Sequence, residues 1–515
     1  MPGENANDQT AASILKLRDF SVSKSCRGAC AKRLILVRRL TQTPLHFGVH
    51  SFRYCDGRLH CDSVDLARVA EKFGTPLYVY SAGTILDHYT RLDAALAPLD
   101  HLICYAVKAN SNRAILKMLA DEGAGFDIVS GGELYRVLAA GGDPAKCTFA
   151  GVGKSSEEIA YALEQRVYSF NVESEAELDY IDRIAGASRR RGMRAPIALR
   201  ANPDVDPHTH EYISTGSHEN KFGIALDRLA AVYERAAKMR KIDIVGVQMH
   251  IGSQITEAKP FADAIKKVAP LVRQLKSKYG IKFFSIGGGL GIVYQTSFAS
   301  GSLDWWNAEH GTSAKHQLSI QQYVDAILRP LRELKLRILL EPGRLLVGNA
   351  GVLLTRVRYI KRTGAKKFAI VDAGMNDLIR PALYHSYHEI VPVEEPSGSI
   401  KGRGDSPNRP SKTTRLRSPR RTTARREGET EKIDIVGPVC ESGDFFALDR
   451  QMPELREGDL LAIMSAGAYG FVMASNYNSR PLPAEALVRG DKFALIRHRQ
   501  TNKDLIRGEI DPQWL

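Results

Sequence analysis

The residues of this 515-residue chain that are best suited to chemistry each follow a short apolar run. Lys108 follows "HLICYAV", and His250 follows "IVGVQM". The glycines of "GGGLG" (287–291) follow "FFSI", and "EPGR" (341–344) follows "RILL". A lysine amine in a partly desolvated pocket can lose its proton and attack a carbonyl group. Adjacent glycines let backbone N–H groups approach a phosphate closely.

Each of these features alone has a structural explanation. A lysine often ends a strand where the chain reaches solvent, and a single histidine is more often a satisfied core residue. "GGG" can form a tight loop, and "EPGR" can form a turn with an ion pair. Coincidence explains the four together poorly, because an amine, an imidazole, a phosphate cradle, a carboxylate and a guanidinium are what pyridoxal 5'-phosphate (PLP) requires. We therefore predict a PLP site.

The elements that would position these residues alternate regularly. Between residues 76 and 344, nine short apolar strands alternate with amphipathic helices: "PLYVY", "LICYAV", "FDIVS", "CTFAG", "YSFNV", "PIALRANP", "IDIVGVQMH", "FFSIGGG" and "RILLEPGR". A TIM-like (β/α)8 barrel needs eight strands, so one of the nine, the first being our candidate, should lie at its edge or outside. The C-terminal ends of barrel strands form the rim that carries barrel active sites, and all four motifs stand at such ends.

A second, mostly-β domain is expected after the barrel. Helical periodicity fades after Arg344 and strand-like runs such as "KKFAIVDAG", "KIDIVGPVC" and "KFALIRHR" follow. We assign residues 76–344 to the PLP-binding barrel, and 48–75 together with 345–515 to the β domain. Residues 395–430 are rich in Arg, Ser, Pro and Thr, which predicts a disordered basic insertion.

The net charge of +14 is concentrated in two segments. Residues 1–50 carry +5 and residues 397–430 carry +7, which leaves +2 for the rest and argues against an evenly basic nucleic-acid surface. We expect residues 1–47 to be a disordered extension. A transit peptide and a start codon downstream of Met1 are alternatives there. A basic arm that contacts RNA or acidic partners is an alternative for the insertion.

Cysteine usage and hydropathy set further limits. The seven cysteines are irregularly spaced, which does not fit a disulfide framework, and Cys26 and Cys30 lack the second pair that a zinc site needs. No apolar run reaches the length of a membrane span. We expect no metal and a reducing, cytoplasmic location.

As a set, the motifs resemble one family, the barrel-type PLP-dependent amino-acid decarboxylases with an alanine-racemase-like barrel and a β domain. The motifs are "YAVKAN", "FDIVSGGEL", "EYISTGSHENKFGI", "HIGSQI", "GGGLG", "EPGR", "DLIRPALY", "GPVCESGD" and "GAYG". The similarity runs from about residue 48 to the C-terminus, except for 395–430 and a looser stretch near 295–316.

The resemblance implies roles for matching residues at the cofactor. Lys108 would carry PLP covalently, Glu341 would face the pyridine nitrogen, and His250 would stack on the ring. The carboxylate would keep that nitrogen protonated, so that the ring accepts the electrons left when CO2 departs. The remaining cofactor-binding residues would be Ser253, Gly288, Gly289, Pro342, Gly343, Arg344 and Tyr469.

The resemblance also implies substrate contacts and a partner chain. Cys440 would return a proton to the substrate carbon, and Glu441 would hold the distal ammonium group. A substrate carboxylate would be bound by Arg380, since its planar fork matches that group. Tyr384, Arg344 and Tyr469 would also contact the substrate. A homodimer with shared active sites is implied as well.

Within this family, Glu441 and Arg380 together with "EYISTG", which decarboxylases of ornithine or arginine do not usually show, imply meso-2,6-diaminopimelate as the substrate and L-lysine as the product. Ornithine, arginine and carboxynorspermidine are alternative substrates. A PLP-binding relative without turnover is an alternative of another class. The presence of the β domain, Lys108, Cys440 and Tyr469 in one chain argues against it.

Overall fold

A computed structural model describes residues 49–187, 192–206, 221–302, 304–306, 318–364, 366–395 and 430–515. The predicted extension 1–47 and most of the predicted insertion 395–430 therefore lie outside the described residues. Glu395 and Thr430, at the two ends of that insertion, are described. Thr430 begins a strand, and the backbone N–H of Glu395 donates to the carbonyl of Gly57.

Eight parallel strands close into a barrel, as the alternation of strands and helices predicts. The order around it is β9-β11-β12-β13-β5-β6-β7-β8, and β8 pairs with β9 to close the ring. A two-residue strand, β10 (Ile224–Ala225), pairs with β9 outside this ring. The barrel strands are β5 (His101–Ala106), β6 (Gly125–Ile128), β7 (Cys147–Phe149), β8 (Ser169–Val172), β9 (Ala195–Asn202), β11 (Ile242–Met249), β12 (Phe283–Ser285) and β13 (Arg337–Leu340).

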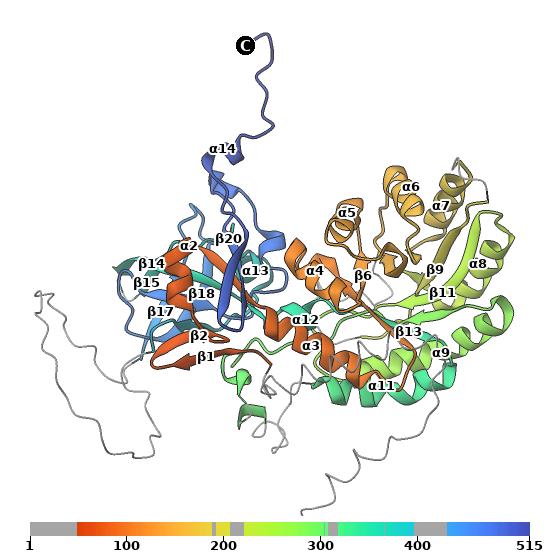
Figure 1. Ribbon diagram of the computed structural model, residues 1–515, viewed down its shortest axis with the longest axis horizontal. Coiled ribbons are helices and arrows are strands. Elements are labelled where there is room, and N and C mark those ends of the chain that lie inside the picture. The colour runs from red at the N-terminus through yellow and green to blue at the C-terminus, as the bar shows by residue number, and fades with distance from the viewer. Residues whose placement is uncertain are drawn as a thin grey trace, which may run out of the picture. The chain divides into compact units, whose positions relative to one another are not determined.

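Helices that alternate with these strands lie around the outside of the barrel (Figure 1). They are α3 (Ala82–Ala95), α4 (Arg113–Asp121), α5 (Gly131–Ala139), α6 (Ser156–Gln165), α7 (Glu175–Ala187), α8 (Leu226–Lys238), α9 (Lys259–Tyr279) and α11 (Ile320–Leu334). In the described part of the chain, no helix combines the length and the apolar character that crossing a membrane would require.

Local sequence explains where α4, the helix that follows Lys108, begins and ends. The Asn112 side chain caps its N-terminus by accepting from the N–H of Ala114. The apolar side chains of Ile115 and Leu119 are buried on one face. Gly123, at φ +92°, turns the chain away after the helix in a conformation that disfavours other residues.

The first of the nine predicted strands lies outside the barrel, as expected of one of them. This strand, β4 (Leu77–Ser81), pairs antiparallel with β14 (Gly351–Thr363) and parallel with β20 (Ala484–Arg489). The predicted barrel boundary at residue 76 therefore takes in a strand whose hydrogen-bonding partners belong to the second domain. All five of its residues are buried.

The second sheet contains β4, β14, β20 and strands that mostly come from the C-terminal part of the chain. The strands not yet named are β15 (Lys366–Val371), β16 (Ile390–Pro392), β17 (Thr430–Val436), β18 (Phe445–Pro453), β19 (Leu460–Ile463) and β21 (Lys492–Arg497). A small sheet of β1 (Phe52–Cys55), β2 (Arg58–Cys61) and β3 (Val64–Asp65) precedes α2 (Leu66–Phe73). Their apolar side chains share a core with β4, β14, β19 and β20.

Buried hydrogen bonds tie the loop that carries Lys108 to the second sheet. The Glu485 carboxylate, which is fully buried on β20, accepts from Tyr80 Oη at 2.8 Å and from Asn112 Nδ2 at 2.9 Å. The backbone N–H of Tyr469 donates to the carbonyl of Ala109 at 2.8 Å. The residues that flank Lys108 are thus held by both the barrel and the β domain.

We predict that replacing residues 398–429 with a short Gly-Ser linker leaves kcat/KM within about twofold of the wild type, because a flexible linker can span an insertion at little entropic cost. The flanking strands have their own partners, since β16 pairs with β19, and β17 pairs with β15 and β18. Steady-state assays and thermal unfolding of the purified protein provide the measurement. Loss of both fold and activity would show that the segment is structural.

Candidate active site

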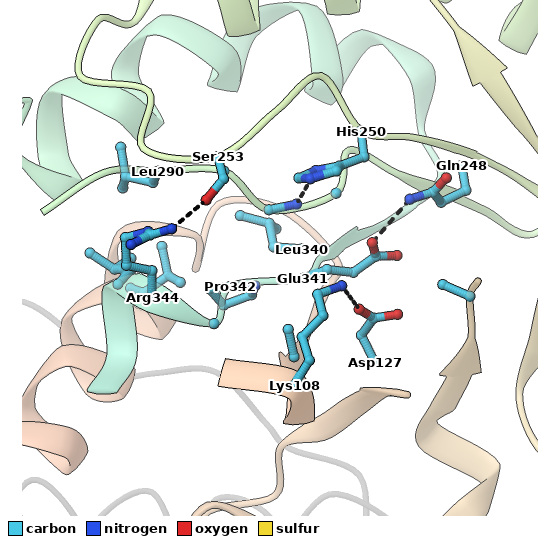
Figure 2. A pocket seen from close by; sticks show the side chains of 18 of the residues that line it. Lys108, Asp127, Gln248, His250, Ser253, Leu290, Leu340, Glu341, Pro342 and Arg344 are labelled. Carbon is cyan, nitrogen blue, oxygen red and sulfur yellow. Dashed lines mark hydrogen bonds and ion pairs between the residues drawn. The ribbon is translucent and has the colours of Figure 1, made fainter. Parts of the chain in front are cut away.

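Lys108 lies where β5 ends, in the short 3-10 turn η3 (Val107–Ala109), and its amine reaches into a pocket at the rim. Nζ lies 3.1 Å from Oδ2 of Asp127, which lies near the end of the neighbouring strand β6 (Figure 2). The lysine side chain is 42% exposed and the aspartate side chain 1% exposed. Burial lowers the pKa of Lys108, but the Asp127 carboxylate, with Tyr469 and Glu341, raises that pKa above its usual value. The amine of the cofactor-free chain is therefore charged.

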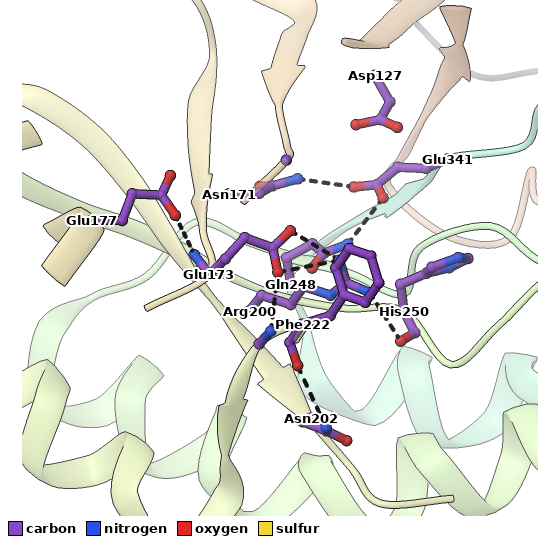
Figure 3. Close-up of polar contacts among 12 residues, drawn as sticks. Asp127, Asn171, Glu173, Glu177, Arg200, Asn202, Phe222, Gln248, His250 and Glu341 are labelled. Carbon is purple, nitrogen blue, oxygen red and sulfur yellow. Dashed lines mark hydrogen bonds and ion pairs between the residues drawn. The ribbon is translucent and has the colours of Figure 1, made fainter. Parts of the chain in front are cut away.

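Glu341, at the end of β13, lies deeper in the pocket and is held by three donors. Oε1 accepts from Ser285 Oγ at 2.7 Å and from Asn171 Nδ2 at 3.3 Å, and Oε2 accepts from Gln248 Nε2 at 3.0 Å (Figure 3). Burial and the nearby Asp127 raise the pKa of Glu341 to about 7, although the donors and Lys108 act to lower it. Near neutral pH this carboxyl group can therefore be either protonated and neutral or ionised and negative.

Replacing Glu341 with Gln should change how the stability of the cofactor-free protein depends on pH. Because burial raises the Glu341 pKa from 4.5 to about 7, folding favours its protonated form, and the wild type loses stability as pH rises through this window. The amide of Glu341→Gln cannot ionise, so the variant should gain about 3 kcal/mol relative to the wild type as pH rises from about 4.5 to 7. Urea unfolding at each pH measures the difference. A difference that stays constant over this range would contradict the raised pKa.

His250 follows β11 and contacts the glycine loop. The backbone N–H of Gly288 donates to Nδ1 of His250 at 3.3 Å, which assigns the ring proton of a neutral imidazole to Nε2. Burial lowers the pKa of His250 well below its usual value, and the charges of Arg200 and Lys108 lower it further. Arg200 is fixed by Glu173, with Nη1–Oε1 at 2.9 Å, and its Nη2 lies 3.5 Å from the His250 carbonyl (Figure 3). The ring is thus held neutral.

The glycine loop leaves no room for side chains. An added Cβ at Gly288 would lie 2.2 Å from the Glu341 carbonyl oxygen, and one at Gly289 (φ +111°) would lie 2.4 Å from the carbonyl oxygen of Gly252. The bare backbone faces the same pocket as Ser253 and Arg344, whose Oγ and Nη2 are 2.9 Å apart (Figure 2). Backbone amides, a hydroxyl and a guanidinium suit a phosphate.

Ten of the residues predicted from the sequence line this one pocket. They are Lys108, His250, Ser253, Gly288, Gly289, Glu341, Pro342, Gly343, Arg344 and Tyr469. Arg380 and Tyr384 lie on α13 (Arg380–Tyr384) and do not line it, but the Arg380 guanidinium lies over the ring of Tyr294, which also contacts Arg344. Cys440 and Glu441 are exposed on the second domain and are also not among the lining residues.

Several polar residues of the site were missed by sequence reasoning. They share a buried position in or directly beside the pocket: Asp127, Asn171, Glu173, Arg200, Gln248 and Ser285. All but Glu173 occupy barrel strands, and Glu173 directly follows one. Polar side chains near the C-terminal end of an otherwise apolar barrel strand are the signal that could have found them.

The residues present fit PLP. A lysine amine stands at the rim, a carboxyl group lies deep in the pocket, and a neutral imidazole lies beside a glycine loop that excludes side chains. When bound there, the cofactor supplies a protonated ring that accepts an electron pair from the substrate. Lys108 would hold it covalently, Glu341 would face its ring nitrogen, and the glycine loop with Ser253 would hold its phosphate, while Arg344 at the edge of the pocket would serve the charged end of the substrate.

Comparisons with known proteins agree with this fit. A family model described as "Pyridoxal-dependent decarboxylase, pyridoxal binding domain" matches residues 82–348. The diaminopimelate decarboxylase of Pseudomonas aeruginosa is 48% identical over 89% of this chain and 98% of its own length. That of Aquifex aeolicus is 42% identical over 89% of this chain and 97% of its own.

Solved structures agree as well. The diaminopimelate decarboxylase of M. jannaschii matches with a TM-score of 0.76 and 36% identity over 90% of this chain and 99% of its own. The enzyme of Helicobacter pylori, solved in complex with L-lysine, matches with a TM-score of 0.73 and 38% identity over 86% of this chain and 98% of its own. The matches cover almost the whole of each relative, so the similarity includes the second domain as well as the barrel. The chain therefore belongs to the pyridoxal-dependent decarboxylases and, within them, to the diaminopimelate decarboxylases.

Proposed function

We propose that this protein removes the carboxyl group from one end of meso-2,6-diaminopimelate and releases CO2 and L-lysine, the last step of lysine biosynthesis. The observation that carries the proposal is the 48% identity over 98% of the length of a diaminopimelate decarboxylase. The pocket supports it, because it gathers the amine, the deep carboxyl group and the glycine loop that PLP chemistry needs.

The residues at the cofactor divide the work in this proposal. Lys108 would hold the cofactor covalently, and Asp127, 3.1 Å from its Nζ in the cofactor-free chain, would position that amine. Glu341 would keep the ring nitrogen protonated, which is the charge state in which the ring accepts electrons from the substrate carbon. The neutral ring of His250 would pack against the cofactor without adding a positive charge.

Other residues bind the substrate and return a proton. Arg380, Tyr384 and Arg344 bind the carboxylate that is retained, and Glu441 binds the ammonium group at that same end. Cys440 returns a proton to the carbon that lost CO2. Tyr469 contacts the cofactor and the substrate, and its left-handed backbone (φ +55°) with the hydrogen bond to Ala109 supports a fixed position at the pocket.

We further propose a homodimer in which each chain completes the site of its partner, located in the cytoplasm. Support comes from the position of Cys440 and Glu441, which are exposed and do not line the pocket of their own chain. The backbone N–H of Cys440 donates to Oδ1 of Asn478 at 3.3 Å, so this exposed segment is held in place by its own domain. An exposed cysteine and an exposed carboxylate of this kind could reach a second pocket across a two-fold axis.

A CO2-release assay with PLP tests the substrate. We expect turnover of meso-diaminopimelate to exceed that of ornithine, arginine and carboxynorspermidine by at least about a hundredfold in kcat/KM, because unpaired buried arginines reject a ligand end without a carboxylate. Faster turnover of any of the other three would overturn the substrate and leave the reaction class standing. Cofactor absorbance without CO2 release from any diamino acid would overturn the enzymatic proposal.

A further inference from the structure

Two buried arginines beside the pocket have no acidic partner. Arg344 and Arg380 are each 6% exposed, and among the described residues neither forms an ion pair with a carboxylate. Arg344 donates to Tyr294 Oη at 2.5 Å and to Ser253 Oγ, and Arg380 donates to Ser386 Oγ at 3.2 Å. The Nε atoms of both arginines are buried without a hydrogen-bond partner. A buried cation in this state is costly, so the pair is built to receive an anion.

One aromatic ring contacts both arginines. The guanidinium carbon of Arg344 lies 5.8 Å and that of Arg380 5.5 Å from the ring centre of Tyr294. Each arginine has one further ring over which its guanidinium lies, Tyr469 for Arg344 and Tyr384 for Arg380. Among the cation–π contacts of the described residues, Tyr294 is the only ring that the two share. The negative face of an aromatic ring attracts a cation, which offsets the repulsion between two like charges held close together.

Tyr294 is itself held from behind. Its ring packs edge-to-face against His388, with ring centres 5.2 Å apart and an angle of 80°. Burial, with the charge of Arg380, lowers the pKa of His388 to about 3, so that ring is neutral and bonds the Met464 carbonyl through Nδ1. The backbone of Ile292, two residues earlier, is hydrogen-bonded at both its N–H and its carbonyl by the side chain of Gln254. The tyrosine is therefore part of a fixed wall.

We propose that Tyr294 is a positioning residue that makes the two arginines selective for a substrate end that bears a carboxylate. This inference rests on the proposed function. The phenol oxygen accepts from Nη1 of Arg344 while Ser253 accepts from Nη2, so the orientation of the guanidinium is set before a ligand binds. The Nε atom of each arginine still lacks a hydrogen-bond partner, so the pair keeps unused donor capacity for an anion.

The electrostatics of Tyr294 agree with this role. Burial raises the pKa of the phenol, but Arg344 and Arg380 lower it further than burial raises it, so the net pKa lies below its usual value. The phenol hydroxyl is thus more acidic than that of an ordinary buried tyrosine, and the partial negative charge on its oxygen stabilises the two arginines. Among described groups that face this cluster, Tyr384, Tyr469 and His388 are the other titratable side chains that contact it.

The test compares two ligands that differ only in the carboxylate at the retained end, L-lysine and 1,5-diaminopentane. Their dissociation constants are measured by calorimetry on PLP-loaded wild type and Tyr294→Phe. The substitution should weaken L-lysine about tenfold and leave 1,5-diaminopentane within about twofold, because the lost oxygen orients only the carboxylate-binding arginine. With meso-diaminopimelate, KM should rise by a similar factor while kcat stays within about twofold.

Tyr168→Phe is the matched control. Tyr168 is also partly buried, and its hydroxyl also interacts with an arginine, Arg337. It precedes β8, however, and Arg337 begins β13, so this pair lies at the opposite end of the barrel from the pocket. The control should therefore leave both dissociation constants unchanged.

The outcomes separate the two proposals. If Tyr294→Phe raises both dissociation constants equally, or changes neither, the role of Tyr294 is overturned. Turnover of meso-diaminopimelate by the wild type would still uphold the proposed function. A wild type that releases no CO2 from meso-diaminopimelate would overturn the proposed function itself. If Tyr294→Phe does not fold, Tyr294→His keeps a ring and an acceptor nitrogen, and it should reduce the preference for L-lysine by about threefold only.

Discussion

Lys108→Ala is expected to lower kcat with meso-diaminopimelate by at least about a thousandfold, because the amine that holds the cofactor and exchanges it for the substrate is removed. The cofactor-free protein should change in stability by only about 1 kcal/mol, since a rim side chain contributes little core burial. The Lys108 side chain is 42% exposed. CO2 release, the absorbance of bound PLP and urea unfolding give the three measurements.

Lys117→Ala is the matched control for this substitution. Lys117 lies on α4, in the helix that follows Lys108, and its side chain is 63% exposed and paired with Asp121 at 3.0 Å. An exposed i,i+4 pair contributes little, so both kcat and stability should stay close to those of the wild type. Activity of Lys108→Ala near that of the wild type would show that the reactive amine has been misassigned.

Mixing Lys108→Ala with Cys440→Ala is expected to restore activity that neither variant has alone. If the site of one chain uses Cys440 of its partner, a heterodimer has one site that lacks both residues and one that has both. Random exchange makes half of the dimers heterodimers, so about a quarter of all sites should recover, by the symmetry of a two-fold dimer. CO2 release is measured before and after subunit exchange, with affinity tags on the two chains to count heterodimers.

The position of Cys440 makes this test decisive. Lys108 lines the pocket of its own chain, whereas Cys440 is exposed on the second domain and does not. If the two residues met within one chain, every site in the mixture would lack one of them. No recovery, with heterodimers present, would therefore rule out the shared site.

Parallel strand topology explains why much of the site could be predicted. A closed parallel barrel brings the C-terminal ends of all its strands to one rim, so Lys108, His250, the glycine loop and Glu341 meet once each is placed at a strand end. More than two hundred residues separate Lys108 from Glu341 in the sequence, but a closed parallel barrel brings the ends of their strands to the same rim. The barrel followed from the alternation of strands and helices, and the ten predicted residues that line the pocket followed from this rule together with the resemblance to the family.

Contacts that depend on side-chain packing could not be predicted in this way. Asn171 and Gln248 are single polar residues within apolar strands, and their hydrogen bonds to Glu341 depend on which face of each strand points inward. Tyr294 follows the glycine loop closely, yet its contact with Arg380 is set by where α13, which packs against β18, places that arginine. No spacing along the chain indicates these partners.

The strands β18 and β20 were also missed. The sequence of β20, "AEALVR", is rich in residues that favour helices, but pairing with β4 and β21 imposes an extended conformation. That of β18, "FFALDRQMP", mixes charged and apolar residues without clear alternation. Its pairing with β17 determines its conformation. Local propensity gave way to tertiary pairing in both.

The pairing of β4 with β14 and β20 has a consequence for synthesis on the ribosome. The barrel strands run without interruption from residue 101 to residue 340, so the barrel can form while the rest of the chain is still being translated. By contrast, β4 emerges before the barrel and its partners emerge after it, more than 250 residues later. This early strand, buried in the finished protein, must wait unpaired until the barrel has been made, which makes that interval the one in which a nascent chain most needs a chaperone.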